Sequence, residues 1–269
     1  MNDAAIGVFD SGMGGLTVMR ALMQRLPNER FVYLGDTARL PYGTKSADTV
    51  RRYALQAATA LTARGVKLVV IACNTASVSL PALTDALAPL PVVGVIEPGA
   101  EAALAANPDG PIAVIATEGT VRGGAYVRAI GQRGNVPVVQ QACPLFVPLA
   151  EEGLVDGPVA EAIVHRYLDP LLATVPKPKS LLLGCTHYPV LKETIARIAG
   201  PDVALIDSAE TTAAAVKKLL KDENLDAPKR ASLPPRFLVT DAPDRFARVG
   251  EIFLGEPIDP GMVELVDLQ

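Results

Sequence analysis

The strongest constraint on the fold is a series of short, uninterrupted apolar runs that alternate with longer stretches of helical periodicity. The runs are Ile6–Phe9, Phe31–Leu34, Val66–Ala72, Val92–Val95, Ile112–Ala116, Val136–Val139, Ser180–Gly184, Val203–Ile206 and Phe237–Val239. Strands that are apolar on both faces are typical of parallel sheets covered by helices on each side. The helical patterns are Gly15–Leu26, Ser46–Arg64, Ser77–Leu87, Gly123–Arg133, Val159–Ala173, Val190–Ala199 and Thr211–Lys221. The alternation predicts an α/β fold with mainly parallel sheets.

Part of this pattern occurs twice. Ile6–Val18 (IGVFDSGMGGLTV) and Ile112–Val127 (IAVIATEGTVRGGAYV) each contain a strand, a turn with a hydroxyl side chain, and Gly-Gly before a helix. Leu68–Ser77 (LVVIACNTAS) and Leu181–Val190 (LLLGCTHYPV) each contain an apolar strand that ends in cysteine and polar residues. The two pairs occur in the same order at nearly the same separation. They predict two pseudo-symmetric α/β domains that face each other across an active-site cleft.

The chain length fits one large or two modest domains, because 269 residues exceed the usual size of a single small domain. We expect residues 1–97 plus 208–269 to form the first domain, which carries Cys73. We expect residues 98–207 to form the second, which carries Cys185. The stretch Lys221–Gln269 contains no motif that we can assign.

Charge and cysteine content exclude several classes of protein. The net charge is −4 and no long basic run is present, which argues against an electrostatic nucleic-acid binder. No window approaches the ~18 consecutive apolar residues of a membrane span, and no secretory signal is visible, so we expect a cytoplasmic protein. Three cysteines are too few for a disulfide scaffold and are expected to be free thiols.

Two of these thiols stand where α/β sheets bind ligands. Cys73 and Cys185 each follow a strand, and ligands bind beyond the carboxyl ends of parallel strands. A helix N-terminus next to a thiol favours the thiolate. Cys143 and His165 lack such a setting, and we expect both to be structural.

Three kinds of chemistry could use two opposed thiols. A redox pair is disfavoured because no CxxC motif is present, and zinc bound by Cys73, Cys185 and His187 would lack a finger-like spacing. The third is proton transfer on two faces of one carbon, which a racemase needs. A cysteine pKa near 8.5 lies close enough to neutral pH to be tuned for that work.

The flanking residues suit a small anionic amino acid. The loop Asp10–Gly15 can offer backbone N–H groups to a carboxylate, and it matches neither a P-loop nor GxGxxG. The turn Pro41–Gly43 can hold a second carboxylate, or it is a surface turn. Asn74-Thr75 and Thr186-His187 supply hydrogen-bond donors directly after each cysteine. Asp10 and His187 are the candidates to assist the two thiols.

Five segments together resemble the glutamate racemase family of cofactor-independent amino-acid racemases. They are IGVFDSGMGGLTV, LGDTARLPYG, ACNTAS, ACPLFVPLAEEG and LLLGCTHYPVL, in order from Ile6 to about Asp207. The resemblance implies interconversion of L- and D-glutamate without cofactor or metal, and supply of D-glutamate for peptidoglycan. It also implies a cytoplasmic homodimer that binds neither membrane nor nucleic acid.

The resemblance also implies a role for each residue of the matched motifs. Cys73 would remove the α-proton of D-glutamate with help from Asp10. Cys185 would remove that of L-glutamate with help from His187 and Glu151, the first residue of a Glu-Glu pair. The implied substrate contacts are Asp10, Ser11, Pro41, Tyr42, Gly43, Asn74, Thr75, Thr117, Thr120, Thr186 and His187. Asp36 would support these contacts from behind.

Two other functions stay open at this stage. One is a racemase for aspartate or another acidic amino acid, and the other is a non-catalytic amino-acid-binding or regulatory protein. The residues do not decide whether a cell-wall precursor activates the protein, nor whether it inhibits DNA gyrase, as some family members do.

Overall fold

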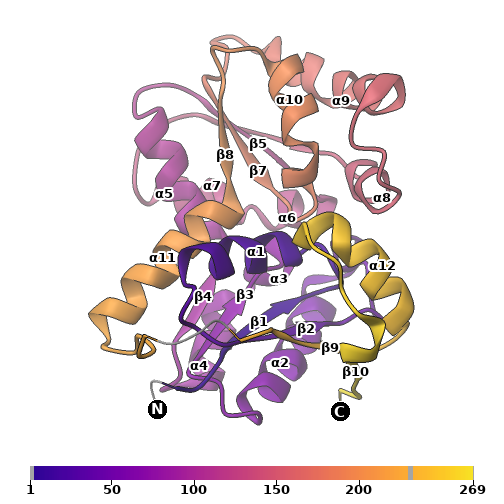
Figure 1. Ribbon diagram of the computed structural model, residues 1–269. Helices are drawn as coiled ribbons and strands as arrows, with labels where there is room; N and C mark the ends of the chain where they lie inside the picture. The colour runs from indigo at the N-terminus through magenta and orange to yellow at the C-terminus, as the bar shows by residue number, and fades with distance from the viewer. Residues whose placement is uncertain (1–2, 230–232, 269) are drawn as a thin grey trace.

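Two parallel sheets, one in each lobe of the molecule, form the frame (Figure 1). The computed structural model describes residues 3–229 and 233–268. The lower sheet has the order β10-β9-β2-β1-β3-β4, and its strands are β1 (Ile6–Asp10), β2 (Phe31–Gly35), β3 (Leu68–Ile71), β4 (Val92–Gly94), β9 (Arg236–Val239) and β10 (Val263–Leu265). The upper sheet has the order β6-β5-β7-β8, and its strands are β5 (Ile112–Ala116), β6 (Val138–Ala142), β7 (Ser180–Gly184) and β8 (Ala204–Asp207).

Helices cover both faces of each sheet, as the uninterrupted apolar strands require. In the lower lobe, α2 (Ala47–Thr62), α3 (Asn74–Ser77) and α4 (Leu80–Leu87) lie on one side of the sheet, and α1 (Leu16–Arg25), α11 (Ser208–Asp222) and α12 (Pro243–Leu254) on the other. In the upper lobe, α5 (Ile96–Ala106), α6 (Glu118–Gly123) and α7 (Ala125–Gly131) face α8 (Phe146–Glu151), α9 (Gly157–Leu172) and α10 (Lys192–Ala199) across the sheet. Short 3₁₀ turns are η1 (Tyr42–Thr44), η2 (Tyr188–Leu191) and η3 (Pro260–Met262).

The predicted internal repeat is visible in the strand order. In the first unit the strands run β2-β1-β3-β4, and in the second they run β6-β5-β7-β8. In each unit the first strand therefore lies between the second and the third, and the fourth lies next to the third. The strands β9 and β10 extend only the lower sheet. The prediction of two pseudo-symmetric α/β units with parallel sheets is confirmed.

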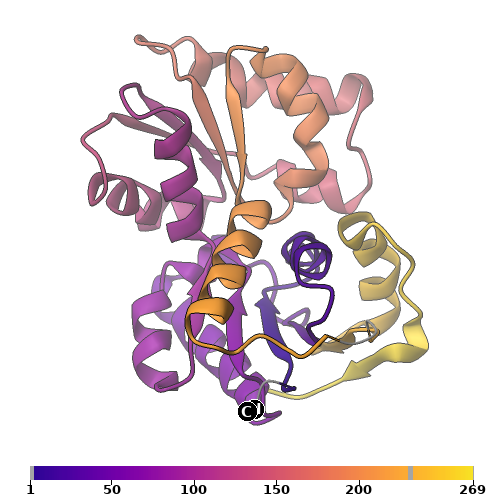
Figure 2. The same ribbon diagram turned by 60° about the vertical axis from the view of Figure 1, so that its left-hand side comes forward.

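The predicted division of the chain stays a proposal, although strand membership agrees with it. The strands of the lower sheet come from residues 6–94 and 236–265, and those of the upper sheet from 112–207. The boundary at residue 97 falls inside α5. Helix α11, which starts at Ser208, packs against both α1 and α5 (Figure 2).

The sequence patterns located most elements, but some predictions were wrong. The predicted strand Val136–Val139 is β6, which starts two residues later at Val138. The predicted helices Ser77–Leu87 and Gly123–Arg133 are each preceded by a short helix, α3 and α6, that starts at the end of a strand. Besides α3 and α6, the α-helices and strands that were not predicted are α5, α8, α12 and β10.

A buried ion pair anchors the connection between α11 and β9. The Lys67 ammonium lies 2.6 Å from a Glu29 carboxylate oxygen, and both side chains are almost fully buried. Lys67 also donates to the carbonyl of Leu225, and Glu29 accepts from the backbone N–H of Ala227. The pair therefore ties the C-terminal part of the chain to the lower sheet.

We expect Lys67→Met to destabilise the protein by about 3–5 kcal/mol, because it leaves the Glu29 carboxylate buried without its counter-charge. Urea unfolding followed by circular dichroism measures the change. The double variant Lys67→Met/Glu29→Gln removes the orphaned charge and is expected to recover part of the loss. Equal stability of Lys67→Met and the unmodified protein would contradict this role of the pair.

Candidate active site

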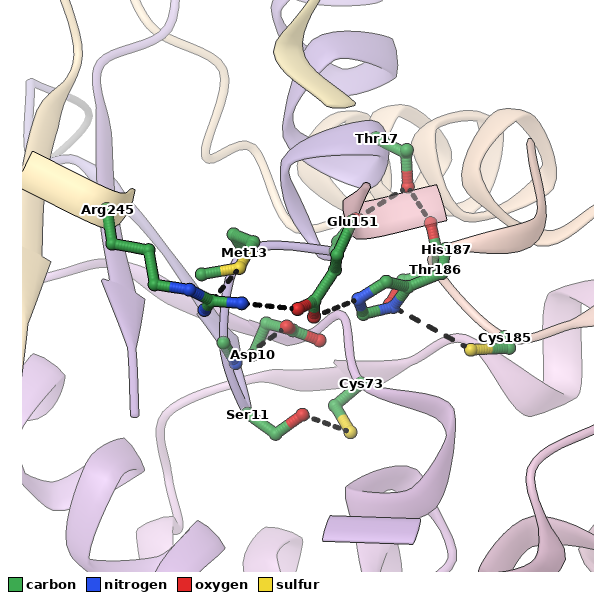
Figure 3. Close-up of polar contacts among 12 residues, drawn as sticks. Asp10, Ser11, Met13, Thr17, Cys73, Glu151, Cys185, Thr186, His187 and Arg245 are labelled. Carbon is green, nitrogen blue, oxygen red and sulfur yellow. Dashed lines mark hydrogen bonds and ion pairs between the residues drawn. The ribbon is translucent and has the colours of Figure 1, made fainter. Parts of the chain in front are cut away.

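The first thiol lies at the carboxyl end of the lower sheet. Cys73 follows β3 and precedes α3, and its side chain is only 5% exposed. Its Sγ lies 3.5 Å from Ser11 Oγ, which follows the adjacent strand β1 (Figure 3). Asp10, the last residue of β1, is fully buried beside this pair. Parallel pairing of β1 with β3 is what brings Asp10 and Cys73 together.

The second thiol lies at the carboxyl end of the upper sheet and has its own partners. Cys185 follows β7, is also 5% exposed, and has its Sγ 3.9 Å from His187 Nδ1. The other ring nitrogen, Nε2, lies 3.0 Å from Glu151 Oε1 at the end of α8. Figure 3 shows the side chains of Cys185, His187 and Glu151 in a row across the site.

Burial controls the acidity of both thiols. Desolvation, with a contribution from the Asp10 charge, raises the pKa of Cys73 to about 12. Desolvation raises the pKa of Cys185 as well, and the charges of Cys73 and Asp10 add to the rise. Nearby backbone N–H groups lower both pKa values, as expected for thiols beside helix N-termini, but the loss of hydration outweighs them.

Two buried oxygens at the site lack a hydrogen-bond partner among the described residues. Asp10 Oδ2 accepts from the Gly12 N–H, but Oδ1 is unpartnered. Asn74 donates its amide to the Tyr126 hydroxyl, while its Oδ1 is unpartnered. Desolvation raises the pKa of Asp10 although the neighbouring N–H groups and His187 oppose it. An unpaired buried acceptor is costly, so these atoms suit a ligand that donates hydrogen bonds.

Threonine hydroxyls and glycines join the two lobes beside the thiols. Thr75 Oγ1 lies 2.9 Å from Thr117 Oγ1 and 3.2 Å from Thr120 Oγ1, so the lower and upper units share one hydroxyl cluster. A Cβ on Gly119 would lie 2.8 Å from the Gly43 carbonyl oxygen, and one on Gly14 would lie 2.3 Å from His187 Nδ1. Side chains at these glycines would push the lobes apart.

Most residues implied by the resemblance lie at this junction. Asp10, Asn74, Thr75, Thr120, Thr186 and His187 are buried there, and Ser11, Gly43 and Thr117 are half-buried. Pro41 is exposed. Tyr42 is buried, but its hydroxyl is hydrogen-bonded to Asp36, which also accepts from Arg39 and Thr240. Asp36 thus holds the Pro41–Gly43 turn through its hydrogen bond with the Tyr42 hydroxyl.

Of the two adjacent glutamates, Glu151 reaches the site. Its carboxylate contacts His187, whereas Glu152 is exposed. Burial alone would raise the pKa of Glu151, but hydrogen bonds and charges from His187 and Arg245 outweigh it and hold that pKa below its usual value. Cys143 is fully buried in the upper core, and His165 is exposed on α9 beside Asp169.

Helix α12 brings to this site two residues, Arg245 and Phe253, that the motifs did not predict. Arg245 Nη2 lies 2.8 Å from Glu151 Oε2, and the Phe253 ring packs edge-on to His187 with centroids 4.9 Å apart. A helix signal was present in Pro243 at the first turn, apolar residues at helical spacing, and Gly255 with a φ of 80° at the end.

Within the described residues, 3–229 and 233–268, no group of three or more His, Cys, Asp or Glu side chains is arranged to hold a metal ion. None of the helices described is long and apolar enough to cross a membrane.

We expect Cys73 and Cys185 to remain thiols well above pH 8. A pKa of about 12 leaves roughly one Cys73 in ten thousand ionised at pH 8. The ¹³Cβ chemical shifts of labelled cysteine measure ionisation directly, and a sample unfolded in urea should titrate near pH 8.5 as the control. A midpoint below pH 9 for Cys73 in the folded protein would contradict the burial effect.

Comparison with known proteins identifies the family. The sequence model of the Asp/Glu/Hydantoin racemase family matches residues 6–216. A glutamate racemase from Geobacter metallireducens is 50% identical over 253 residues, which cover 93% of each chain. One from Syntrophus aciditrophicus is 48% identical, over 98% of this chain and 96% of the relative.

A solved structure is similar over the whole chain. The glutamate racemase from Francisella tularensis, crystallised in complex with D-glutamate, is 38% identical and superposes with a TM-score of 0.91, covering 100% of this chain and 99% of its own. Two cysteines at equivalent strand ends, the repeated strand order and these matches lead to one conclusion: the chain belongs to the Asp/Glu/hydantoin racemase family.

Proposed function

We propose that the protein is a glutamate racemase that interconverts L- and D-glutamate by proton transfer between the substrate α-carbon and two thiols. The observation that carries the proposal is the pair of buried cysteines, Cys73 and Cys185, one from each sheet. Each is only 5% exposed, and Figure 3 shows both thiols in the same site, beside Asp10 and His187. A racemase needs such a pair, because the proton leaves one face of the carbon and returns to the other.

The site chemistry suits an amino acid. The unpartnered oxygens of Asp10 and Asn74 can accept hydrogen bonds from the substrate ammonium group. The hydroxyl cluster of Thr75, Thr117 and Thr120, with the backbone N–H groups of the loops that follow the strands, can bind the carboxylates. We propose Ser11, Pro41, Tyr42, Gly43, Thr186 and His187 as the remaining substrate contacts, with Pro41 and Tyr42 acting through their backbone.

In the direction from L- to D-glutamate, the Cys185 thiolate takes the α-proton and becomes a thiol. The Cys73 thiol donates its own proton to the opposite face and becomes a thiolate. His187 accepts the Cys185 proton through Nδ1 before this step, and Glu151 stabilises the imidazolium. In the reverse direction Cys73 is the base, and Asp10 accepts its proton. Between turnovers in one direction, a proton passes back from Cys185 to Cys73 through the site or solvent.

The raised thiol pKa values help the chemical step although they reduce the amount of thiolate. An amino-acid α-proton is very weakly acidic, and a base with a higher pKa takes it more readily. The buried cleft also replaces water with fixed hydrogen-bond donors around the developing negative charge. Holding each sulfur against the α-carbon removes much of the entropic cost of the encounter.

Glutamate is favoured over the alternative substrates by the named relatives, which are glutamate racemases and one of which was crystallised with D-glutamate. An aspartate racemase or a non-catalytic amino-acid-binding protein would have to use the same cleft. The supply of D-glutamate for peptidoglycan, a cytoplasmic location and a homodimer belong to the same proposal and rest on the family resemblance.

We expect Cys73→Ser to lower racemisation by roughly 10²–10⁴-fold, because a serine hydroxyl is a far weaker acid than a thiol. The assay is proton NMR in D₂O with L- or D-glutamate and, in parallel, aspartate, combined with optical rotation. Cys143→Ala is the matched control, since this third buried thiol lies outside the proposed machinery, and it should retain activity. Full activity of Cys73→Ser would exclude the two-thiol mechanism. Binding of glutamate without α-proton exchange by the unmodified protein would identify a binding protein.

We expect Gly14→Ala to reduce racemisation about tenfold or more, because its Cβ would lie 2.3 Å from His187 Nδ1 and displace the ring. Gly131→Ala is the control: nothing lies within 4 Å of a Cβ there, and alanine favours the helix. The same NMR assay compares the two. Unchanged activity of Gly14→Ala would show that the close approach of this loop to His187 is dispensable.

A further inference from the structure

Helix α12 contributes a charged side chain to the Cys185 half of the site. Arg245 Nη2 lies 2.8 Å from Glu151 Oε2, while His187 Nε2 lies 3.0 Å from Oε1 of the same carboxylate. Figure 3 shows the resulting row of side chains from Arg245 through Glu151 and His187 to Cys185. Arg245 comes from the lower lobe, and the other three residues come from the upper lobe.

Because one Glu151 oxygen contacts Arg245 and the other contacts His187, the carboxylate determines which nitrogen of the neutral imidazole carries the proton. An ionised carboxylate only accepts hydrogen bonds, so the His187 nitrogen that faces it, Nε2, carries a proton. In the neutral ring the other nitrogen, Nδ1, is then the unprotonated one. This is the nitrogen that faces Cys185 Sγ, at 3.9 Å. The contact with Glu151 thus selects the tautomer that can accept the thiol proton.

Arg245 stabilises both the ionisation and the orientation of Glu151. Its charge favours the carboxylate over the carboxylic acid, so Glu151 remains an acceptor and does not take the proton from His187. The guanidinium is itself held by a contact of Nη1 with Met13 Sδ at 3.7 Å. Phe253, two turns further along α12, packs against the His187 ring. The helix therefore supports the imidazole at two points.

We propose that Arg245 is a positioning residue for the Cys185 half of the reaction: by holding Glu151, it selects the neutral tautomer of His187 in which Nδ1 is the acceptor, and it keeps this nitrogen directed at the thiol. The proposal rests on the proposed racemase function for its kinetic consequence, but not for its structural one. It gives the C-terminal segment, which the motifs left unassigned, a part in proton transfer.

The structural consequence can be measured without any assay of activity. The chain has two histidines, His187 and His165, so long-range ¹H–¹⁵N spectra of histidine-labelled protein resolve both rings. We expect the Nε2–H tautomer for His187 in the unmodified protein and a mixture of tautomers in Arg245→Met. His165, exposed on α9, is the internal control and should not change.

The kinetic consequence is a change in isotope effects that differs with direction. Enantiomers have equal free energy, so kcat/KM is the same in both directions for every variant and cannot report on one thiol. Deuterium at the α-carbon of L-glutamate reports on transfer to Cys185, and deuterium in D-glutamate reports on transfer to Cys73. In Arg245→Met we expect kcat/KM to fall about tenfold. The isotope effect on kcat/KM should rise with L-glutamate and fall with D-glutamate.

Matched variants separate positioning from general destabilisation. Arg248→Met removes an exposed arginine from the same helix and should change neither the spectra nor the isotope effects. Arg245→Lys keeps the charge and should restore part of the activity. Circular dichroism verifies folding, and Arg245→Gln replaces Arg245→Met if the latter is unfolded.

Each outcome decides the proposal. Unchanged His187 signals in Arg245→Met, or a loss of activity with unchanged isotope effects in both directions, would overturn it. If the unmodified protein lacks racemase activity, the proposed function fails, whereas the His187 tautomer in the variants still tests the role of Arg245.

Discussion

The exclusion of water from two thiols between the carboxyl edges of two parallel sheets is the constraint on which the rest of the structure depends. Parallel strands bring their loops to one edge, and here two such edges meet, so that Cys73 and Cys185 are each only 5% exposed. Removing hydration from a thiol makes its anion scarce but strongly basic. Polar side chains at this junction also lose their hydration, so their hydrogen bonds to one another matter more than they would at a surface. The buried carboxylate of Asp10 accepts from Gly12, and the hydroxyls of Thr75 and Thr117 pair with each other.

The repeat in the chain explains why the two thiols are opposed, but the two halves are not equivalent. Cys73 contacts Ser11 and lies beside Asp10, which are the residue after β1 and the last residue of β1. Cys185 instead has an imidazole, His187, backed by Glu151. A carboxylic acid and an imidazole differ in charge when they hold a proton, so the two halves need different support. Under the proposed mechanism, the Asp10 half would require only burial, because a protonated carboxylic acid is neutral, whereas the His187 half would require a fixed anion to stabilise the imidazolium. The β9, α12 and β10 elements, which have no counterpart in the second unit, add the arginine that keeps this anion in place.

The sequence was sufficient for those features that depend on local pattern. Uninterrupted apolar runs located the strands of the two repeats, and the position of Cys73 and Cys185 at strand ends indicated where ligand chemistry would occur. Three features of the site could not be predicted from the sequence, each for a physical reason. The acidity of the thiols depends on how much water the closed lobes exclude, which no spacing encodes. The role of Gly14 depends on a contact with His187, far away in the chain. Arg245 lies on an amphipathic helix whose apolar spacing was readable, but its partner Glu151 is identified only by the docking of the lobes.

These long-range contacts couple the surroundings of Cys185 to the docking of the two lobes. Arg245 meets Glu151, Gly14 meets His187, and the Thr17 hydroxyl donates to the Thr186 carbonyl at 2.9 Å, each time from the lower lobe to the upper. Any separation of the lobes that admits water to the thiols must also break these contacts. The loss of hydration that makes the thiolates basic and the contacts that orient His187 are thus gained or lost together. A partly open cleft would have a hydrated thiol without an oriented acceptor, so under the proposed mechanism proton transfer at Cys185 would require the docked arrangement of the two lobes.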